Sequence, residues 1–474
     1  NPVLLCAYNN DSQFTLNFHA LPLSKNTLQG DGTAANPYQI TCAADFIQID
    51  DQPMAHYQIM NDIDFGGAAF VGLQKTFGGK LDGGNKKLTN LYLNGSGLFR
   101  EVVDTAVIKN IHLVEPVMAL NGNGLYAGLV ANTMRGGFTD EGAELSAQLS
   151  NVHVVAPTIV GQEFAGVCGG LIGEASLFVK MSECSLQEAI IDLPRAEAVG
   201  GLVGQMMTSS NMNVAAFSGK IQGGATVGGI AASVDGDSPV QHAHVNADIA
   251  GAAIVGGIVG SSERATIANN YVEGTLALAM ATEKGGVGGI VGALAADIMG
   301  QATDAIVYDN IVALQSIQAP QGAIAHRVVG FSSCNDYEYD WDNVDWNKDQ
   351  SEWPRIYGNP EKCLKDNYVT SALAILDATI TAEHTTTEGA DMAANELTSE
   401  WLNTHGFALD YSVTAPWVLN NGALYLWFED GQTGTGIEDI WTDNATSTAR
   451  KMLINGQVVI IRDGQMYSVL GVRM

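Results

Sequence analysis

The chain has 474 residues, with 22 Lys or Arg against 51 Asp or Glu, and its net charge is −29. A field of this sign repels phosphate backbones, and no run of Lys and Arg offsets it, so nucleic acid is excluded as a partner. Hydrophobic residues make up 46% of the chain, which is enough to build a core. No apolar run reaches the roughly 18 residues of a membrane-spanning helix.

The first predicted element is an N-terminal lead-in over residues 1–40. It begins at Asn1-Pro2, as the product of a trimming step would. Spaced apolar residues between Thr41 and Ile49 predict a short helix after it. We expect the lead-in and the helix to cap the fold that follows.

A glycine-hydrophobic signature recurs through the middle of the chain, with clear copies that have the pattern Gly-Gly-Leu/Ile-Val/Ile-Gly. Repeats of about 30 residues are typical of a solenoid. The two longest intervals contain insertions at 135–147 and 293–303, which we expect to project as loops. The anchor glycines of the repeats are Gly97, Gly128, Gly170, Gly201, Gly229, Gly257, Gly289 and Gly330.

A second pattern follows most anchors and alternates apolar with polar residues, as in Ile108–Leu113. This period of two indicates strands with one buried face. Glycines at sharp bends and one strand pattern per repeat together predict an all-β fold, a right-handed parallel β-helix over 41–335. Four asparagines at nearly equivalent places are expected to stack and bond through their amides: Asn110, Asn151, Asn270 and Asn310.

Residues 336–430 are predicted to cap the other end, beginning with an acidic and aromatic stretch. Its rings could stack on sugars or anchor a protein partner. The alternative is a solvated acidic turn whose rings pack on the last rung. The acids could hold Ca²⁺, but no Asp-x-Asp-x-Asp-Gly loop is present, so we assign no metal ligand and no cofactor. The candidate binding residues are Tyr337, Tyr339, Trp341 and Trp346.

Two elements complete the chain. The apolar spacing of Asn395–His405, followed by Gly406, predicts a cap helix that lays Trp401 on the last rung. In residues 437–474, Asn-Gly and Asp-Gly turns separate apolar runs and predict a small β-meander.

The cysteines contain no Cys-x-x-Cys pair, which excludes a zinc ribbon or a thioredoxin-type site. Their spacing leaves two interpretations open: disulfide bridges, or small buried hydrophobic residues. The six are Cys6, Cys42, Cys168, Cys184, Cys334 and Cys363.

The glycine repeats resemble the GLUG motif of bacterial surface proteins. The segments Gly30–Ile40, Asn61–Asn85 and Phe407–Trp427 are similar to parts of GLUG β-helix proteins, and Gly456–Tyr467 is similar to the C-terminal tails of secreted proteins in Bacteroidetes-type bacteria. The resemblance covers roughly residues 28–474 and implies a secreted or cell-surface protein of the kind usually described as an adhesin. GLUG repeats also accompany some immunoglobulin-cleaving metallopeptidases.

Catalytic motifs are absent from the sequence, including His-Glu-x-x-His, Gly-x-Ser-x-Gly and the P-loop. A β-helix hydrolase would need converging carboxylates, and the acids of the regular repeats are scattered. His242 and His244 share one strand face and could bind a metal with a third ligand; the alternative is two ordinary polar positions. We therefore predict that the chain is not an enzyme.

The sequence thus predicts a noncatalytic binding protein, extracellular or on the outer cell surface, that acts in cell adhesion through a glycan or a protein ligand. Two alternatives remain, a polysaccharide-degrading β-helix hydrolase or lyase and the accessory region of a surface peptidase. Carboxylates lining a groove at the level of the rungs would favour the polysaccharide enzyme.

Overall fold

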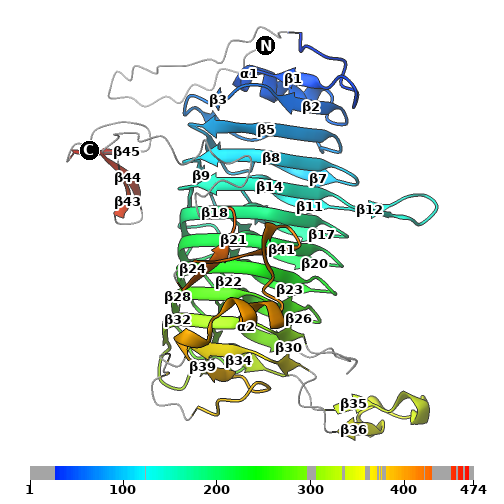
Figure 1. Ribbon diagram of the computed structural model, residues 1–474. Coiled ribbons are helices and arrows are strands. Elements are labelled where there is room, and N and C mark those ends of the chain that lie inside the picture. Colours follow the sequence, from blue (N-terminus) through cyan, green and yellow to red (C-terminus); the bar gives the residue numbers. More distant parts are fainter. Residues whose placement is uncertain are drawn as a thin grey trace, which may run out of the picture.

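The structure is a computed structural model that describes residues 27–122, 124–295, 306–333, 337–357, 363–370, 373, 375, 380–420 and 422–429, and the backbone of three strands between 450 and 468. Parallel strands wind through most of this chain as a β-helix, which confirms the predicted fold class (Figure 1). One apolar cluster fills its interior from Ile40 to Leu373. No helix in these ranges has the length and apolar character needed to cross a membrane.

Each complete rung gives one strand to each of three parallel sheets. Sheet 1 holds the longest strands: β1 (Tyr38–Ile40), β2 (His56–Ile59), β3 (Ile63–Asp64), β4 (Ala69–Phe70), β5 (Lys80–Thr89), β6 (Tyr92–Asn94), β8 (Val107–Val114), β9 (Val117–Ala119), β14 (Gln148–Val155), β15 (Thr158–Val160), β18 (Lys180–Asp192), β21 (Asn211–Gln222), β24 (Val240–Gly251), β27 (Ile267–Ala268), β28 (Tyr271–Leu278), β31 (Val307–Tyr308), β32 (Ile311–Gln318), β37 (Leu364–Lys365), β38 (Tyr368–Thr370) and β39 (Ala390–Met392).

Sheets 2 and 3 hold short strands. Sheet 2 contains β10 (Tyr126–Ala127), β16 (Val167–Gly169), β19 (Ala198–Gly200), β22 (Thr226–Gly228), β25 (Ile254–Gly256), β29 (Val287–Gly288) and β33 (Ala325–His326). Sheet 3 contains β7 (Phe99–Val103), β11 (Ala131–Arg135), β17 (Ile172–Ser176), β20 (Val203–Met207), β23 (Ala231–Asp235), β26 (Val259–Glu263), β30 (Val291–Ala295) and β34 (Val329–Ser332).

The anchor glycines from Gly170 to Gly289 stack in one column, with one repeat per rung as predicted. A Cβ on Gly201 would lie 1.9 Å from the carbonyl oxygen of Gly229, and a Cβ on Gly229 would lie 2.1 Å from that of Gly257. Only glycine allows neighbouring rungs to approach this closely. The last predicted anchor is wrong: a Cβ on Gly289 would meet the carbonyl oxygen of Arg327, so Arg327 and not Gly330 continues the column.

The predicted asparagine ladder is two ladders in adjacent columns of sheet 1. Asn151 Nδ2 donates to Asn110 Oδ1 at 2.8 Å, and both residues have positive φ at a bend of the rung. One position further along the strand, Asn270 Nδ2 donates to Asn310 Oδ1 at 2.9 Å, and Asn310 donates in turn to Asn367 Oδ1 at 2.9 Å. The second ladder is fully buried, so its amides satisfy one another inside the core.

The predicted insertion at 135–147 projects from the rod as the hairpin β12 (Gly137–Phe138) and β13 (Glu144–Leu145) (Figure 1). Of the second insertion, residues 296–303 lie outside the described residues. An extra segment cannot enter a packed rung without breaking its register, which is why the first one leaves the rod.

The helix predicted near Thr41 is α1 (Ala43–Ile47), continued by η1 (Gln48–Asp51), and it buries Phe46 and Ile49 at the first rungs. Parallel pairing extends from Tyr38 to Met392, beyond the predicted 41–335 at both ends. Residues 1–26 of the predicted lead-in lie outside the described residues.

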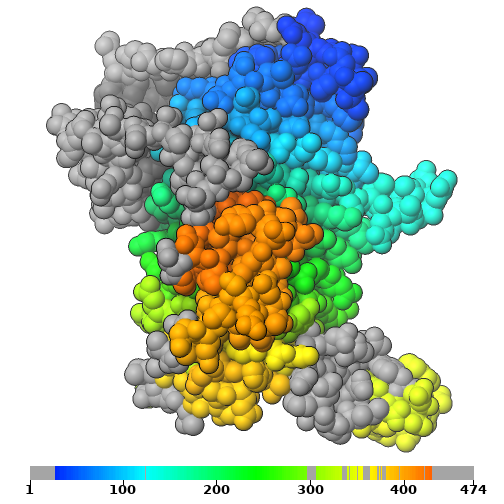
Figure 2. Space-filling model, in the orientation of Figure 1, coloured from blue at the N-terminus to red at the C-terminus, as the bar shows by residue number. Residues whose placement is uncertain are grey.

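Residues 399–429, which we call the strap, fold back over the outer face of sheet 1 (Figures 1 and 2). The strap contains α2 (Ser399–Thr404), β40 (Leu409–Ser412), β41 (Ala415–Asn420) and β42 (Ala423–Leu426), and η5 (Ala394–Glu396) precedes it. Gly406 follows α2 with φ +80°, as predicted, and Trp401 packs on Tyr368 of β38, with the rings 4.8 Å apart. The sequence predicted that this region caps the end of the β-helix. Beyond the helix, the strap instead covers the outer side of several rungs. Its apolar contacts on sheet 1 are Val214, Ala216, Tyr271, Ile311 and Tyr368.

The remaining elements lie outside the rungs. The predicted C-terminal meander is the antiparallel sheet of β43 (Arg450–Ile454), β44 (Gln457–Arg462) and β45 (Gln465–Ser468). The acidic and aromatic stretch forms an excursion made of β35 (Tyr337–Tyr339), η2 (Trp341–Asn343), η3 (Gln350–Glu352) and β36 (Arg355–Tyr357).

Candidate functional site

The four predicted binding residues lie in the excursion between β35 and β36. The ring of Tyr339 is buried and packs edge-on against Trp353 at 5.4 Å. Trp346 is 68% exposed. Its ring packs edge-on against the ring of Trp353, with the centroids 5.2 Å apart. The side chains of Tyr337 and Trp341 fall outside the described part of the structure. The alternation of side chains along the strand ends at Trp341, because η2 begins there. The binding role of the four residues stays a prediction.

A long hollow of about 500 Å³, which we call the groove, runs along the outer corner between sheets 2 and 3. A small residue at the last position of each repeat motif, glycine in most copies, lies at this corner. A Cβ on Gly260 would lie 2.8 Å from Cγ2 of Thr226, which points outward from sheet 2 in the previous rung. The equivalent positions on β20, β23 and β30 are Gly204, Ala232 and Gly292, so a small residue at this position lets the two sheets approach closely.

Polar side chains at equivalent positions line one wall of the groove. Gln205, Ser233 and Ser261 are paired in register on β20, β23 and β26, so they repeat at the rung spacing of about 4.8 Å. Ala293 and Phe331 continue the same column on β30 and β34. The wall thus offers a hydrogen-bonding side chain, one amide and two hydroxyls, on three successive rungs, followed by an apolar end.

Two carboxylates and an ammonium group complete the lining. Asp235 and Glu263 are paired in register at the ends of β23 and β26, and Lys284 lies across from them in the groove. Asp235 also forms an ion pair with Arg264, whose guanidinium nitrogen lies 3.5 Å from Oδ1, and both side chains are about half exposed. This arrangement can hydrogen-bond a polyhydroxylated ligand through carboxylate, amide and hydroxyl groups while Ile254 and Phe331 supply apolar contact.

Sequence reasoning missed the groove because its residues come from several different repeats. A signal was nevertheless present: a polar residue directly follows the last glycine of the motif in Gly204-Gln205 and Gly260-Ser261. Aligning the repeats at that glycine would have placed these side chains in one outward-facing column.

His242 and His244, the candidate metal ligands, have different surroundings. Nδ1 of His242 lies 2.9 Å from Asn213 Oδ1. Nδ1 of His244 lies 2.8 Å from Oε2 of Glu429 in the strap, and its Nε2 lies 3.5 Å from Glu273 Oε2. Within the described ranges, no cluster of three or more His, Cys, Asp or Glu side chains could hold a metal ion.

Among the described cysteines, Cys363, Cys168 and Cys184 follow the two interpretations that the sequence left open, and Cys42 is free and exposed and follows neither. Cys363 is disulfide-bonded. Cys168 and Cys184 are free and buried, and burial raises the pKa of the Cys184 thiol to about 12. These two act as small hydrophobic residues in the core.

No family model matches the sequence, and no curated protein matches it. Two solved structures are similar to this chain. One is described as a "putative immunoglobulin A1 protease" from Bacteroides ovatus, at 15% identity and TM-score 0.41, covering 84% of this chain and 94% of that one. The other is described as "IgA1 Protease", at 14% identity and TM-score 0.38; the match covers 90% of this chain and 32% of that one.

The sequence prediction that the chain is not an enzyme is contradicted by this comparison, because both similar structures are described as proteases, and we withdraw it. A likeness at these TM-scores assigns no activity to this chain. The functional conclusion below therefore rests on the residues of the groove.

Proposed function

We propose that this chain is a secreted or cell-surface β-helix that binds an extended extracellular glycan along the groove, with cell adhesion as its role. The observation that carries the proposal is the column Gln205, Ser233 and Ser261, which presents a polar side chain on three successive rungs. A ligand built of repeating units can make the same contact at each rung. A globular partner would have no reason to match that period.

The chemistry of the lining favours an uncharged glycan. Sugar hydroxyls both donate and accept, so they can satisfy carboxylate, amide and serine groups together. The apolar faces of sugar rings can pack on Phe331 at one end of the groove and on Ile254, which belongs to the same rung as Ser261. An anionic polymer would be repelled by Asp235, by Glu263 and by the net charge of −29.

The disulfide bond of Cys363 supports the extracellular location, because disulfides persist in oxidising compartments and are rare in the cytosol. The GLUG resemblance of the glycine repeats points to the same location.

Binding of the full chain to a glycan array tests the proposal. Ser261→Trp would fill the groove, and Ser316→Trp on the outer face of β32 serves as the matched control. We expect the wild-type and the control to bind the same glycans and Ser261→Trp to lose at least tenfold in affinity at an unchanged melting temperature. Equal binding by all three proteins would contradict the proposal.

A second candidate function, glycan cleavage, is favoured by one observation. Asp235 and Glu263 occupy adjacent rungs, whose spacing of about 4.8 Å is close to the roughly 5–5.5 Å between the two carboxyl groups of retaining glycosidases. Incubation with glycans identified on the array tests it. Release of reducing ends by the wild-type and loss of release in Asp235→Asn and Glu263→Gln would establish cleavage; no release by the wild-type would exclude it for those glycans.

A further inference from the structure

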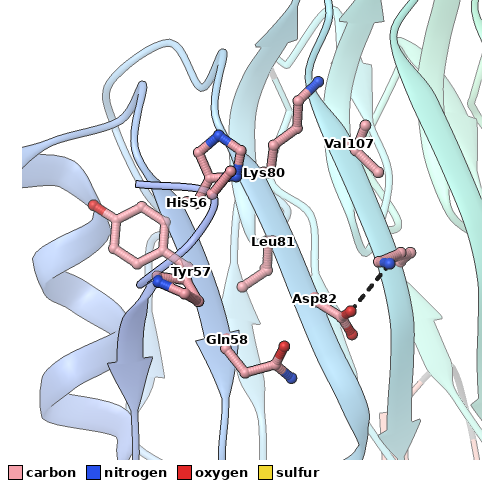
Figure 3. A pocket seen from close by; sticks show the side chains of 10 residues that line it. His56, Tyr57, Gln58, Lys80, Leu81, Asp82 and Val107 are labelled. Carbon is pink, nitrogen blue, oxygen red and sulfur yellow. Dashed lines mark ion pairs between the residues drawn. The ribbon is translucent and has the colours of Figure 1, made fainter. Parts of the chain in front are cut away.

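A second hollow, of about 340 Å³, opens on the outer face of sheet 1 at the first rungs (Figure 3). It is far from the groove in the fold, because β2, β5 and β8 build it and β20 to β34 build the groove. Its volume lies at the lower end of the roughly 300–1,000 Å³ that small-molecule pockets have, so it suits a small ligand.

Cationic side chains from successive rungs converge on this hollow. His56 on β2 is paired with Lys80 on β5, and Lys109 on β8 is paired with Asp82 on β5. The three basic residues are more than 20 positions apart in sequence, so no run of Lys and Arg announced them. Rung stacking alone brings them to one face.

The surrounding rungs differ in charge from the rest of the chain. Residues 75–135 contain seven Lys or Arg and four Asp or Glu, whereas the remaining residues contain 15 and 47. The rung that carries His56 has no Lys or Arg between residues 34 and 74, so the positive charge at the hollow comes from the individual side chains of Lys80 and Lys109. Such local fields decide where a charged ligand binds.

The acid in the hollow is already satisfied. Asp82 forms an ion pair with Lys109 at 3.1 Å, and its Oδ1 accepts hydrogen bonds from the backbone N–H of Gly84 at 2.9 Å and from Asn110 Nδ2 at 2.8 Å. These partners neutralise the carboxylate and fix its position. Asp82 therefore does not neutralise Lys80, whose positive charge can interact with a ligand in the hollow.

Lys80 and His56 hold unused donors there. The Lys80 ammonium group donates to the carbonyl oxygen of Thr105, which leaves two of its three N–H donors without a partner in the described part of the chain. The imidazole of His56 likewise has no hydrogen-bond partner among the described side chains. Partial burial lowers the pKa of Lys80, so a bound anion would restore the electrostatic stabilisation that its ammonium group loses to burial.

We propose that this hollow binds the carboxylate of a sugar acid, with Lys80 and His56 donating to the carboxylate. Pro37 and Val107 line the hollow and offer apolar contact to the ring, and Gln58 offers an amide to its hydroxyls (Figure 3). The proposal does not depend on the groove, whose acidic lining suits a different ligand.

Calorimetric titration of the full chain with glucuronate, glucose and acetate tests the proposal. We expect glucuronate to bind, glucose to show no heat and acetate to bind at least tenfold more weakly. Equal binding of glucose would overturn the role of the charge. Equal binding of acetate or of inorganic phosphate would show a simple anion site and overturn the sugar-acid class.

Three variants locate the site. Lys80→Gln should lower the affinity for glucuronate at least tenfold, whereas Lys180→Gln, in the same outward column three rungs further along, should leave it unchanged. Val107→Trp, which fills the hollow, should abolish binding and provides a second test if Lys80→Gln folds poorly. Unchanged affinity in both hollow variants would overturn the assignment. Ser261→Trp should leave glucuronate binding intact, which separates this proposal from the groove.

Discussion

Nδ1 of His244 lies 2.8 Å from Oε2 of Glu429, although 185 residues separate the two in the chain. His244 belongs to β24 in the wall of the rod, and Glu429 ends the strap. The imidazole is buried and stacks on Tyr271, with the ring centroids 5.4 Å apart. This pair therefore ties the strap to the side of the β-helix.

The strap should be held less tightly at high pH. Burial alone would lower the pKa of His244, but Glu429 and Glu273 outweigh burial and raise it to about 9. Because this value exceeds the ordinary value of about 6.5, the charged pair contributes fully below pH 6.5 and is lost as the pH rises through about 9. The loss should reach about 3 kcal/mol in the free energy of unfolding.

Urea unfolding of the wild-type and His244→Gln at pH 6.5 and pH 10 measures this contribution. Comparison with the variant removes the contribution of neighbouring groups that titrate in both proteins. Burial raises the pKa of Tyr271. Burial also acts to raise the pKa of Glu273, but the hydrogen bond to His244 outweighs it and lowers that pKa. We expect the two proteins to differ in stability at pH 6.5 and to converge at pH 10. A constant difference at both pH values would contradict the assignment of charge to His244.

Gly229→Ala should destabilise the rod by about 3 kcal/mol, at the upper end of the usual cost of overpacking. The new Cβ would lie 2.1 Å from the carbonyl oxygen of Gly257 and 2.8 Å from Cγ1 of Val245, and the backbone oxygen cannot move without shifting a rung. Gly322→Ala is the control, because it adds the strain of a φ of +80°, which Gly229 does not have, but its Cβ would meet nothing within 4 Å. Thermal unfolding should show the larger loss at Gly229, and a larger loss at Gly322 would disprove the close-approach explanation.

Arg327→Met should cost about 3–5 kcal/mol in the free energy of unfolding, as when one partner of a buried ion pair is removed. The guanidinium group is 2% exposed and bonds Asp391 Oδ1 at 2.6 Å and the carbonyl oxygens of Glu388 and Gly389 at 3.0 Å. Its removal takes away the guanidinium charge 3.7 Å from the buried carboxylate of Glu388 and leaves that carboxylate with His326 and the backbone N–H of residue 327. Arg264→Met, the control, breaks an exposed ion pair and should cost less than about 1 kcal/mol in the free energy of unfolding. Equal losses for the two variants in chemical denaturation would refute a structural role for Arg327.

Trp346→Ala should leave the melting temperature almost unchanged, because the ring is largely exposed. If the excursion is a binding surface, the same change should weaken attachment by about 1 kcal/mol. Tyr339→Ala removes a buried ring and should instead destabilise the excursion. Intact attachment of Trp346→Ala to every glycan and protein that the wild-type binds would remove this residue from the functional account.

The rungs could be predicted from the sequence because their requirement is local. A carbonyl oxygen of the next rung faces each anchor glycine, so the repeat of glycine reports the repeat of structure directly. The same reasoning fails at Arg327, because the column position there is not glycine and the nearest following glycine, Gly330, lies three residues further along. The two asparagine pairs were merged for a related reason: a shift of one residue moves a side chain from the bend into the core.

The strap and the groove could not be predicted from the sequence, because both depend on which faces of separate repeats meet in space. A hint of the strap exists in sheet 1, where Ala216 and Tyr271 are apolar at outward positions that an exposed face would leave polar. Naming the segment that covers them requires the path of the chain after Leu373. Three-dimensional stacking likewise decides that Ser233 and Ser261, 28 residues apart, share one wall.

The dependence of affinity on glycan length tests the central claim most directly. The groove spans five rungs from Gln205 to Phe331, or about 19 Å at a rung spacing of about 4.8 Å. We therefore predict that, for a linear glycan that binds, affinity rises with each added sugar over the first three or four units and then levels off, and that Ser261→Trp abolishes the rise. An affinity that is already maximal with a single sugar, and stays the same with longer chains, would contradict binding along the groove.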